Sequence, residues 1–222
     1  AVALGVGLLG YPQLASMARN HKPLRYMINP LNVVHAATRL AGDRLPRQAH
    51  ALQPVGEDAR LGPSYGRQVR PPLLLLVVGE TARAQNWGLN GYPLPTTPAL
   101  ARWQQTGGLV NYPQVVSCGT NTQVSVPCLF SPLTRAEGGD QPPDRENLLD
   151  VLQRAGLAVL WLDNQAGCKG VCDRVPHGRP EDRALPAALC DGGECLDEAL
   201  LVGLDERIAA LDPVRRARGV VI

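Results

Sequence analysis

Apolar residues fall into short continuous runs separated by stretches of helical spacing, a pattern that predicts strands alternating with helices. The run Leu73–Val78 follows a proline pair and predicts a central parallel strand. Further strands are predicted at Leu109–Val116, at Leu157–Leu162 and from Gly219 onward. Helices are predicted around Thr97–Gln104, over Glu146–Ala155 with Leu148, Leu149 and Leu152 on one face, and over Leu196–Leu211. This alternation predicts an α/β fold with a mostly parallel sheet flanked by helices on both faces.

The first 70 residues have a different character. Residues 1–10 are uncharged and apolar, and predict the tail of a transmembrane helix, although such a helix needs about 20 residues and a buried core segment is the alternative. Prolines break residues 11–41 into short helices, of which Asn32–Leu40 is the best helical piece. Residues 42–70 are rich in Gly, Pro and Arg without a clear period, and are interpreted as a linker.

Composition and charge narrow the class of protein. With 222 residues, 45% of them hydrophobic and 19% charged, the chain suits one sizeable globular domain rather than a disordered segment. The net charge of +2 gives no field that would favour a nucleic-acid partner. Residues 1–70 hold nine Lys/Arg and three Asp/Glu, whereas residues 71–222 hold thirteen and seventeen. A basic front of this kind suits an anionic surface; a coding bias that replaces Lys by Arg is the alternative.

Six cysteines form three close pairs along the chain: Cys118 with Cys128, Cys168 with Cys172, and Cys190 with Cys195. Their proximity favours three local disulfides, which implies an oxidising compartment such as the periplasm. The alternative is a zinc site made by the last four of these cysteines, whose spacing suits zinc. That alternative leaves the first pair unexplained.

Polar residues follow three of the predicted strands, at 79–81, 117–122 and 163–165. Ligands of parallel sheets bind beyond the carboxyl ends of the strands, so these segments predict an active site at one edge. Glu80 in the first segment is either a helix-capping carboxylate or a metal ligand.

The loop from Cys118 to Cys128 is rich in hydroxyl groups and runs into a predicted helix. Thr120, Thr122 and Ser125 are candidate nucleophiles, because a metal can lower the pKa of a hydroxyl, but chemistry alone does not separate them from one another or from an ordinary helix cap. Lys169 is either an anion-binding residue or a solvated lysine. The four histidines show no metal-ligand spacing and are interpreted as surface residues: His21, His35, His50 and His177.

Four ordered motifs carry a specific resemblance. They are VVGETARA at 77–84, LNGY at 89–92, SCGTNTQVSVPCLFS at 117–131 and WLDNQAGCKGVCD at 161–173, and HKPLR at 21–25 with Asn29-Pro30 adds to them. The chain resembles the lipid A phosphoethanolamine transferases, which include the colistin-resistance enzymes. This family combines an inner-membrane part with a periplasmic zinc domain of the alkaline phosphatase/sulfatase-like fold.

The resemblance implies roles for individual residues. Glu80 matches a zinc-binding glutamate, and Thr122 matches the nucleophile that becomes phosphoethanolamine-modified and contacts the zinc. Asn164, Gln165 and Lys169 lie where the family binds substrate phosphate, with Gln165 in place of an asparagine, and the three cysteine pairs match family disulfides. The family completes its zinc site with an Asp-His pair and further histidines that these 222 residues do not contain. Since catalytic zinc takes three or more protein ligands, the chain is interpreted as a fragment that is inactive alone.

The resemblance also implies the reaction and its setting. Phosphoethanolamine passes from phosphatidylethanolamine to a lipid A phosphate through a phosphothreonine, with zinc as cofactor, in a monomer of the inner membrane whose catalytic domain is periplasmic. The corresponding domains are residues 1–10, 11–70 and 71–222. Two alternatives stay open: a related hydrolase or phosphoglycerol transferase of the same fold, and a non-catalytic truncated periplasmic module.

Overall fold

The computed structural model describes residues 33, 36–37, 51–79, 82–138, 145–191 and 194–222. The chain divides into two compact units, residues 1–50 and 51–222. Within the predicted helix Asn32–Leu40, the described residues Val33, Ala36 and Ala37 are helical. The predicted membrane tail at 1–10 lies outside the described residues. Among the helices that are described, none combines the length and the apolar character needed to cross a membrane.

Three parallel strands form the centre of the second unit, in the order β1-β7-β2. β1 (Leu73–Leu74) pairs with β7 (Val220–Val221), and β7 pairs with β2 (Ala158–Val159). The strand predicted from Gly219 is therefore confirmed, and it occupies the middle of the described sheet. The last strand along the chain, β7, thus joins β1 and β2, which are separated by 84 positions in the sequence from Leu74 to Ala158.

Two smaller sheets complete the strand arrangement. β3 (Trp161–Leu162) pairs in parallel with β4 (His177–Gly178), and β5 (Cys190–Asp191) pairs antiparallel with β6 (Glu194–Cys195). The prediction of one strand over Leu157–Leu162 was wrong in one respect, because the run changes sheets at Leu160. An apolar run reports burial and does not by itself reveal where a strand changes its pairing partner.

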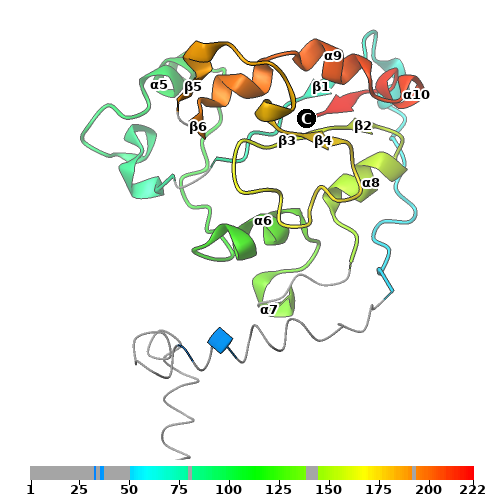
Figure 1. Ribbon diagram of the computed structural model, residues 1–222, viewed down its shortest axis with the longest axis horizontal. Coiled ribbons are helices and arrows are strands. Elements are labelled where there is room, and N and C mark those ends of the chain that lie inside the picture. The colour runs from blue at the N-terminus through cyan, green and yellow to red at the C-terminus, as the bar shows by residue number, and fades with distance from the viewer. Residues whose placement is uncertain (1–32, 34–35, 38–50, 80–81, 139–144, 192–193) are drawn as a thin grey trace, which may run out of the picture. The chain divides into compact units, whose positions relative to one another are not determined.

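Helices cover both faces of the parallel sheet, as the sequence predicts (Figure 1). Val159, 2% exposed, packs in one cluster with residues of α6 (Thr122–Phe130) and α8 (Leu148–Arg154). Its neighbours Ala158 and Leu160 pack in the other cluster, against α9 (Leu204–Ala209). Because successive strand residues point to opposite faces, this alternation places α6 and α8 on one side of the sheet and α9 on the other.

Two strand predictions need correction. The side chains of Leu73–Val78 are 39% to 88% exposed, and β1 is an edge strand of the described sheet rather than a central one. Hydropathy shows that a strand is apolar but does not identify its neighbours. Residues 109–116 form no strand, and Val116 is 89% exposed. Pro113 lies in that run and has no N–H to donate to a ladder.

The helix predictions hold better. The helix around Thr97–Gln104 is α5 (Pro98–Gln105), and the helix over Glu146–Ala155 is α8, although Leu148 is 42% exposed and leaves the apolar face. The predicted helix over Leu196–Leu211 breaks at Gly203, whose φ of +64° ends the 3₁₀ helix η6 (Asp197–Leu201) before α9 starts. The remaining helical elements are α7 (Arg135–Gly138), α10 (Pro213–Arg216), η1 (Tyr65–Arg67), η2 (Ala84–Asn86), η3 (Gly88–Asn90), η4 (Pro180–Asp182) and η5 (Ala187–Leu189).

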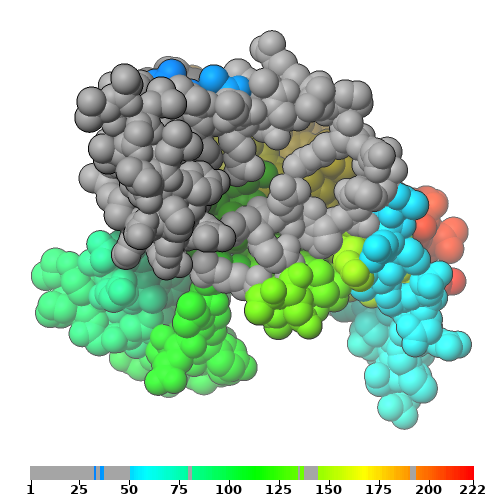
Figure 2. All heavy atoms as spheres, turned by 90° about the horizontal axis from the view of Figure 1, so that it is seen from below, coloured from blue at the N-terminus to red at the C-terminus, as the bar shows by residue number. Residues whose placement is uncertain are grey.

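Residues 51–70, interpreted from the sequence as part of a linker, pack against the domain. The Val55 N–H donates to the Glu146 carboxylate at 2.9 Å, and Arg154 donates to the Val55 carbonyl at 2.5 Å. Arg154 also pairs with Glu146 at 2.5 Å. Figure 2 shows this segment in cyan beside the red atoms of the C-terminal elements. The segment is therefore joined to the start and the end of α8 by side-chain hydrogen bonds.

Candidate active site

Thr122 is the first residue of α6, and the buried residues of this helix share a core cluster with residues of the 168–172 loop. Asn121 caps the helix by accepting a hydrogen bond from the Val124 N–H at 3.1 Å. Val126 and Phe130 follow Thr122 at intervals of four residues, so the three share one side of the helix. Both are buried, in the cluster that also contains Cys168, Val171 and Cys172. This packing places the half-buried Thr122 at the end of the helix face that meets the 168–172 loop.

The loop before α6 is held closely against the helix. A disulfide joins Cys118 to Cys128 in the second half of α6, and Ser117 Oγ donates to the Gly119 carbonyl at 2.8 Å. A Cβ on Gly119 would lie 2.8 Å from Val124 Cγ1, closer than such atoms approach. The loop therefore reaches Thr122 by a path that only glycine allows at this position.

The three candidate hydroxyl residues now differ in their surroundings. Thr120 is exposed in the loop, whereas Ser125 is half-buried one turn into α6. Thr122 stands at the helix N-terminus, where backbone N–H groups and the helix dipole favour a negatively charged group. This position suits a residue that carries a phosphate better than the other two positions do.

A pair of aromatic rings connects α6 to β3. Phe130 and Trp161 have ring centroids 5.4 Å apart at 65°, an edge-to-face contact. Trp161 Nε1 lies 3.4 Å from Asp163 Oδ2, and Asp163 Oδ1 accepts from the Gln165 N–H at 2.6 Å. Asp163 is 8% exposed, so it fixes the 163–165 turn from inside the domain.

The predicted phosphate-contact residues lie along this turn and the loop after it. Lys169 is half-buried, has a φ of +55° and donates from Nζ to the Ala166 carbonyl at 2.5 Å, which leaves two of its three N–H donors for a ligand. The Asn164 amide donates to the Cys195 carbonyl at 2.8 Å and to Asp197 at 2.9 Å, so it joins the turn to the β5–β6 hairpin and keeps its carbonyl oxygen. The Gln165 side chain is exposed and has no hydrogen-bond partner among the described residues.

A buried polar network beneath the 168–172 loop was not anticipated from the sequence. Asn147 caps α8 and donates from Nδ2 to the Val171 carbonyl at 2.8 Å. Asp150 accepts from the Asn147 N–H at 2.7 Å and from Arg174 at 2.7 Å. The Asn-x-x-Asp spacing is a capping-box signal that marks this helix start.

Burial raises the pKa of Asp150, but hydrogen bonds from Arg174 and from the Asn147 N–H lower it further, and the resulting pKa lies below the ordinary value. The same hydrogen bonds, which Arg174 donates to Asp150, raise the pKa of Arg174. Asp150 is therefore a carboxylate at neutral pH, held between two segments of the domain.

All three predicted disulfides are present: Cys118–Cys128, Cys168–Cys172 and Cys190–Cys195. The alternative of a four-cysteine zinc site was therefore wrong, because zinc binds thiolates and not disulfide sulfurs. Cys168, Cys172 and Asp173 have their candidate ligand atoms within 4.8 Å of one another, but the first two are bridged.

The resemblance-implied metal ligand Glu80 lies outside the described residues. Of the two zinc ligands that the resemblance implies, Glu80 and Thr122, only Thr122 is among the described residues. The described part of the chain therefore does not by itself make a zinc site. His177, in β4, is exposed as predicted, with Nδ1 3.0 Å from the Val175 carbonyl oxygen. The other three histidines lie outside the described residues.

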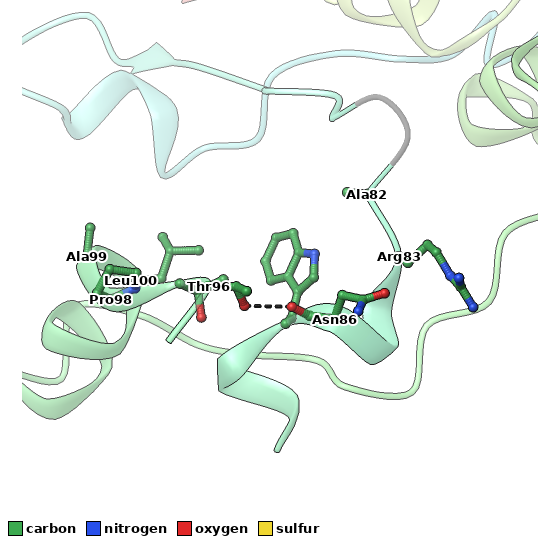
Figure 3. A pocket seen from close by; sticks show the side chains of 9 residues that line it. Ala82, Arg83, Asn86, Thr96, Pro98, Ala99 and Leu100 are labelled. Atoms are coloured by element: carbon green, nitrogen blue, oxygen red, sulfur yellow. Dashed lines mark hydrogen bonds between the residues drawn. The ribbon is translucent and has the colours of Figure 1, made fainter. Parts of the chain in front are cut away.

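A cavity of about 580 Å³ begins two residues after Glu80. Arg83, Asn86 and Trp87 line one side, and the start of α5 lines the other. Figure 3 shows Thr96 bridging the two sides with a hydrogen bond to the Asn86 carbonyl, 2.6 Å long, while Arg83 points away from Pro98. The sequence did not reveal this cavity because its two walls meet only in the folded chain.

Comparison with known proteins shows the family to which this chain belongs. The family model described as Sulfatase matches residues 72–214, and the chain belongs to this family. Within it, the chain is similar to phosphoethanolamine transferases: a second family model, described as Phosphoethanolamine transferase EptA/EptB, matches residues 1–45.

Individual relatives agree with this assignment. The phosphoethanolamine transferase EptA of Escherichia coli (strain K12) is 43% identical over 210 residues, which cover 91% of this chain and 36% of that protein. The phosphatidylethanolamine transferase Mcr-1 of Escherichia coli is 38% identical over 212 residues, covering 88% of this chain and 37% of that protein.

A solved structure extends the similarity to three dimensions. The integral membrane lipooligosaccharide phosphoethanolamine transferase A of Neisseria meningitidis superposes with a TM-score of 0.78 and 39% identity, over 99% of this chain and 39% of that one. The chain thus spans little more than a third of the length of the relatives that it matches.

Proposed function

We propose that the protein transfers phosphoethanolamine from phosphatidylethanolamine to a phosphate of lipid A, through a covalent intermediate on Thr122. The observation that carries the proposal is the face of α6 that begins with Thr122 and packs, through Val126 and Phe130, against the loop that holds Lys169. The similarity to phosphoethanolamine transferases over 91% of the chain supports the same residue roles.

The proposed reaction has two displacement steps at one phosphorus atom. In the first, Thr122 Oγ1 loses its proton and bonds to the phosphorus of phosphatidylethanolamine, while the bond from phosphorus to the diacylglycerol oxygen breaks and diacylglycerol leaves with a proton. In the second, a phosphate oxygen of lipid A bonds to the same phosphorus. The bond to Thr122 then breaks, and Oγ1 regains a proton. The enzyme ends unchanged, and no oxidant or reductant is needed.

The surrounding residues bind and orient the phosphoryl group. Lys169 supplies a positive charge on a backbone fixed by the buried Cys168–Cys172 disulfide, and its hydrogen bond to Ala166 directs Nζ along the loop. The N-terminus of α6 supplies backbone N–H donors beside Thr122. Gln165 offers an exposed amide, and Asn164 offers its carbonyl oxygen for the ethanolamine ammonium. Preorganised donors of this kind stabilise charge that develops on a transferring phosphoryl group.

Zinc dependence is part of the proposal. Glu80 and Thr122 would be two of the ligands, and because catalytic zinc takes three or more protein ligands, others must complete the site. When bound, zinc would act as a Lewis acid that lowers the pKa of a coordinated hydroxyl. On this ligand count we expect residues 1–222 by themselves to release no diacylglycerol from phosphatidylethanolamine.

The proposed setting is the periplasmic side of a bacterial inner membrane, with the enzyme as a monomer. Three disulfides suit an oxidising compartment, and the excess of Lys/Arg in residues 1–70 suits a surface of anionic lipid. The proposed division is a membrane-helix end at 1–10, a juxtamembrane part at 11–70 and a catalytic part from 71 onward. Lipid A modified with phosphoethanolamine would bind cationic peptides such as polymyxins less strongly.

The test uses an ethanolamine label and measures its transfer from phosphatidylethanolamine to the protein and then to lipid A. The full-length protein is incubated with phosphatidylethanolamine labelled in its ethanolamine, and peptide mass spectrometry locates the label. We expect phosphoethanolamine on Thr122, none in Thr122→Ala, and retention of the label in the matched variants Thr120→Ala and Ser125→Ala. Addition of lipid A then moves the label to lipid A. Release of free phosphoethanolamine in water would instead identify a hydrolase, and absence of any labelled protein would leave the non-catalytic module.

A further inference from the structure

A second cavity, of about 790 Å³, lies at the amino ends of the parallel strands. Its walls are the 59–72 segment, the turn from α8 to β2 and the turn from α10 to β7. Pro72, which enters β1, and Ala217–Arg218, which precede β7, are among the lining residues. Thr122 and the 163–165 turn belong to other segments, so this cavity is not the candidate active site. Figure 2 shows two of these three walls, the cyan N-terminal segment and the red C-terminal elements, side by side.

The lining of this cavity is strongly basic. It contains Arg60, Arg70, Arg154 and Arg218, and no Asp or Glu is among the described residues that line it. Arg154 is neutralised by its pair with Glu146 at 2.5 Å, so it adds little net charge. The guanidinium groups of Arg60, Arg70 and Arg218 have neither a hydrogen bond nor an ion pair with any described residue. Three arginines without an ion-pair partner among the described residues therefore line one cavity, and the nearby carboxylate of Glu57 acts on Arg154.

Close packing shapes the cavity floor. A Cβ on Gly156, whose φ is +95°, would lie 2.5 Å from Arg218 Nη1, so the Arg218 guanidinium rests directly on the turn after α8. A Cβ on Gly219 would lie 2.8 Å from the Tyr65 hydroxyl. The two glycines allow Arg218 and Tyr65 to approach the sheet, and a side chain at either position would fill this space.

We propose that this cavity binds a phosphate-bearing anion. Guanidinium groups carry parallel N–H donors that match the oxygens of a phosphate, and several of them can share the oxygens of one phosphate, whereas a carboxylate has only two oxygens to offer. A bound anion would also relieve the repulsion among the three arginines. The volume exceeds that of one inorganic phosphate and falls in the range of small-molecule sites, about 300–1,000 Å³, so a larger headgroup can also fit.

The phosphate can come from a membrane lipid headgroup or from a free phosphate, and the experiment separates these sources. Isothermal titration of the full-length protein in neutral detergent uses inorganic phosphate, short-chain phosphatidic acid (a phosphate monoester) and acetate, each at constant ionic strength. We expect saturable binding of a phosphate probe and none of acetate. Binding of phosphatidic acid alone identifies a lipid headgroup as the ligand, and binding of inorganic phosphate alone identifies free phosphate. Binding of neither, or equal binding of acetate, overturns the proposal.

Matched variants assign the binding to the cavity rather than to the candidate active site. In Arg60→Gln/Arg70→Gln/Arg218→Gln the affinity should fall about tenfold or more, because charge-assisted hydrogen bonds from three guanidinium groups are lost together. The control removes exposed arginines outside the cavity, Arg102→Gln/Arg215→Gln, and should bind as the parent does. Unchanged affinity in the triple variant overturns the proposal.

Two further measurements separate anion binding from a folding defect and from the proposed transferase activity. The charge-retaining Arg60→Lys/Arg70→Lys/Arg218→Lys variant should bind more tightly than the glutamine variant but less tightly than the parent, because lysine lacks the planar fork. Equal affinities in the lysine and glutamine variants contradict the proposal. Labelling of Thr122 by phosphatidylethanolamine is measured in parallel, and we expect it to persist in the glutamine variant, so the two proposals fail separately.

Discussion

Asp150 and Arg174 form a two-point ion pair in which Arg174 Nε reaches Asp150 Oδ1 and Nη2 reaches Oδ2, each at 2.7 Å. The pair joins the first turn of α8 to the segment directly after the Cys168–Cys172 disulfide. Asp150 is 8% exposed at its side chain and Arg174 is 34% exposed. A bidentate pair with one partner buried holds a fixed geometry, which makes it a positioning element for the loop that carries Lys169.

Breaking this pair should destabilise the domain. In Arg174→Gln the Asp150 carboxylate stays buried without its cation, and we expect the free energy of unfolding to fall by about 1–3 kcal/mol, measured by urea unfolding. The matched control is Arg183→Gln, which breaks a pair with Glu206 that is 3.5 Å long and more exposed. That control should change stability by less than about 0.5 kcal/mol. Equal effects of the two substitutions would contradict the positioning role.

The same carboxylate should give the domain an acid-dependent stability. The pKa of Asp150 lies below its ordinary value of 3.8, so its stabilising effect is fully present above that value and is lost as pH falls toward the folded pKa. Asp150→Asn removes this effect at neutral pH. The difference in unfolding free energy between parent and variant should therefore shrink as pH falls below about 4, and a constant difference down to about pH 2 would show that Asp150 does not titrate as proposed.

Gly119 and Val124 offer a test of how the loop before α6 positions Thr122. In Gly119→Ala the new Cβ meets Val124 Cγ1 at 2.8 Å, so either the loop or the helix must shift, and we expect labelling of Thr122 by phosphatidylethanolamine to fall at least about tenfold. Val124→Ala added to Gly119→Ala should restore most of the labelling. Gly66→Ala is the control, because a methyl group at that position would have no neighbouring atom within 4 Å. Failure of the double variant to recover would show that Val124 is not the obstacle.

The contact between Phe130 and Trp161 should contribute strongly to the free energy of unfolding, because it packs α6 against β3. Phe130 is 3% exposed, and Phe130→Ala should lower the free energy of unfolding by about 3–5 kcal/mol because it leaves a cavity between α6 and β3. The adjacent Leu129 is 60% exposed, so Leu129→Ala should cost less than about 1 kcal/mol in the same thermal or urea unfolding measurement. Similar losses of unfolding free energy in the two variants would show that Phe130 is not part of the core.

Local features of the domain could be predicted from the sequence. The helix near the cysteine loop appears, although it begins at Thr122 inside the 118–128 segment. The helix over Glu146–Ala155 and the strand from Gly219 also appear, since short-range spacing and flanking residues determine where such elements begin. The three disulfides also join cysteines that are ten residues apart or fewer. The resemblance to a family singled out Thr122 as the expected nucleophile, which stays a prediction, and residue chemistry alone did not separate it from Thr120 and Ser125.

Only the tertiary structure decided which segments meet. It places β7 rather than β1 at the middle of the described sheet, divides Leu157–Leu162 between two sheets, and brings the face of α6 below Thr122 against the 168–172 loop. It also gathers Arg60, Arg70 and Arg218 around one cavity, from positions up to 158 residues apart. The physical reason is that pairing partners, burial and charge clusters depend on contacts between distant parts of the chain. Hydropathy and spacing describe only neighbours along it.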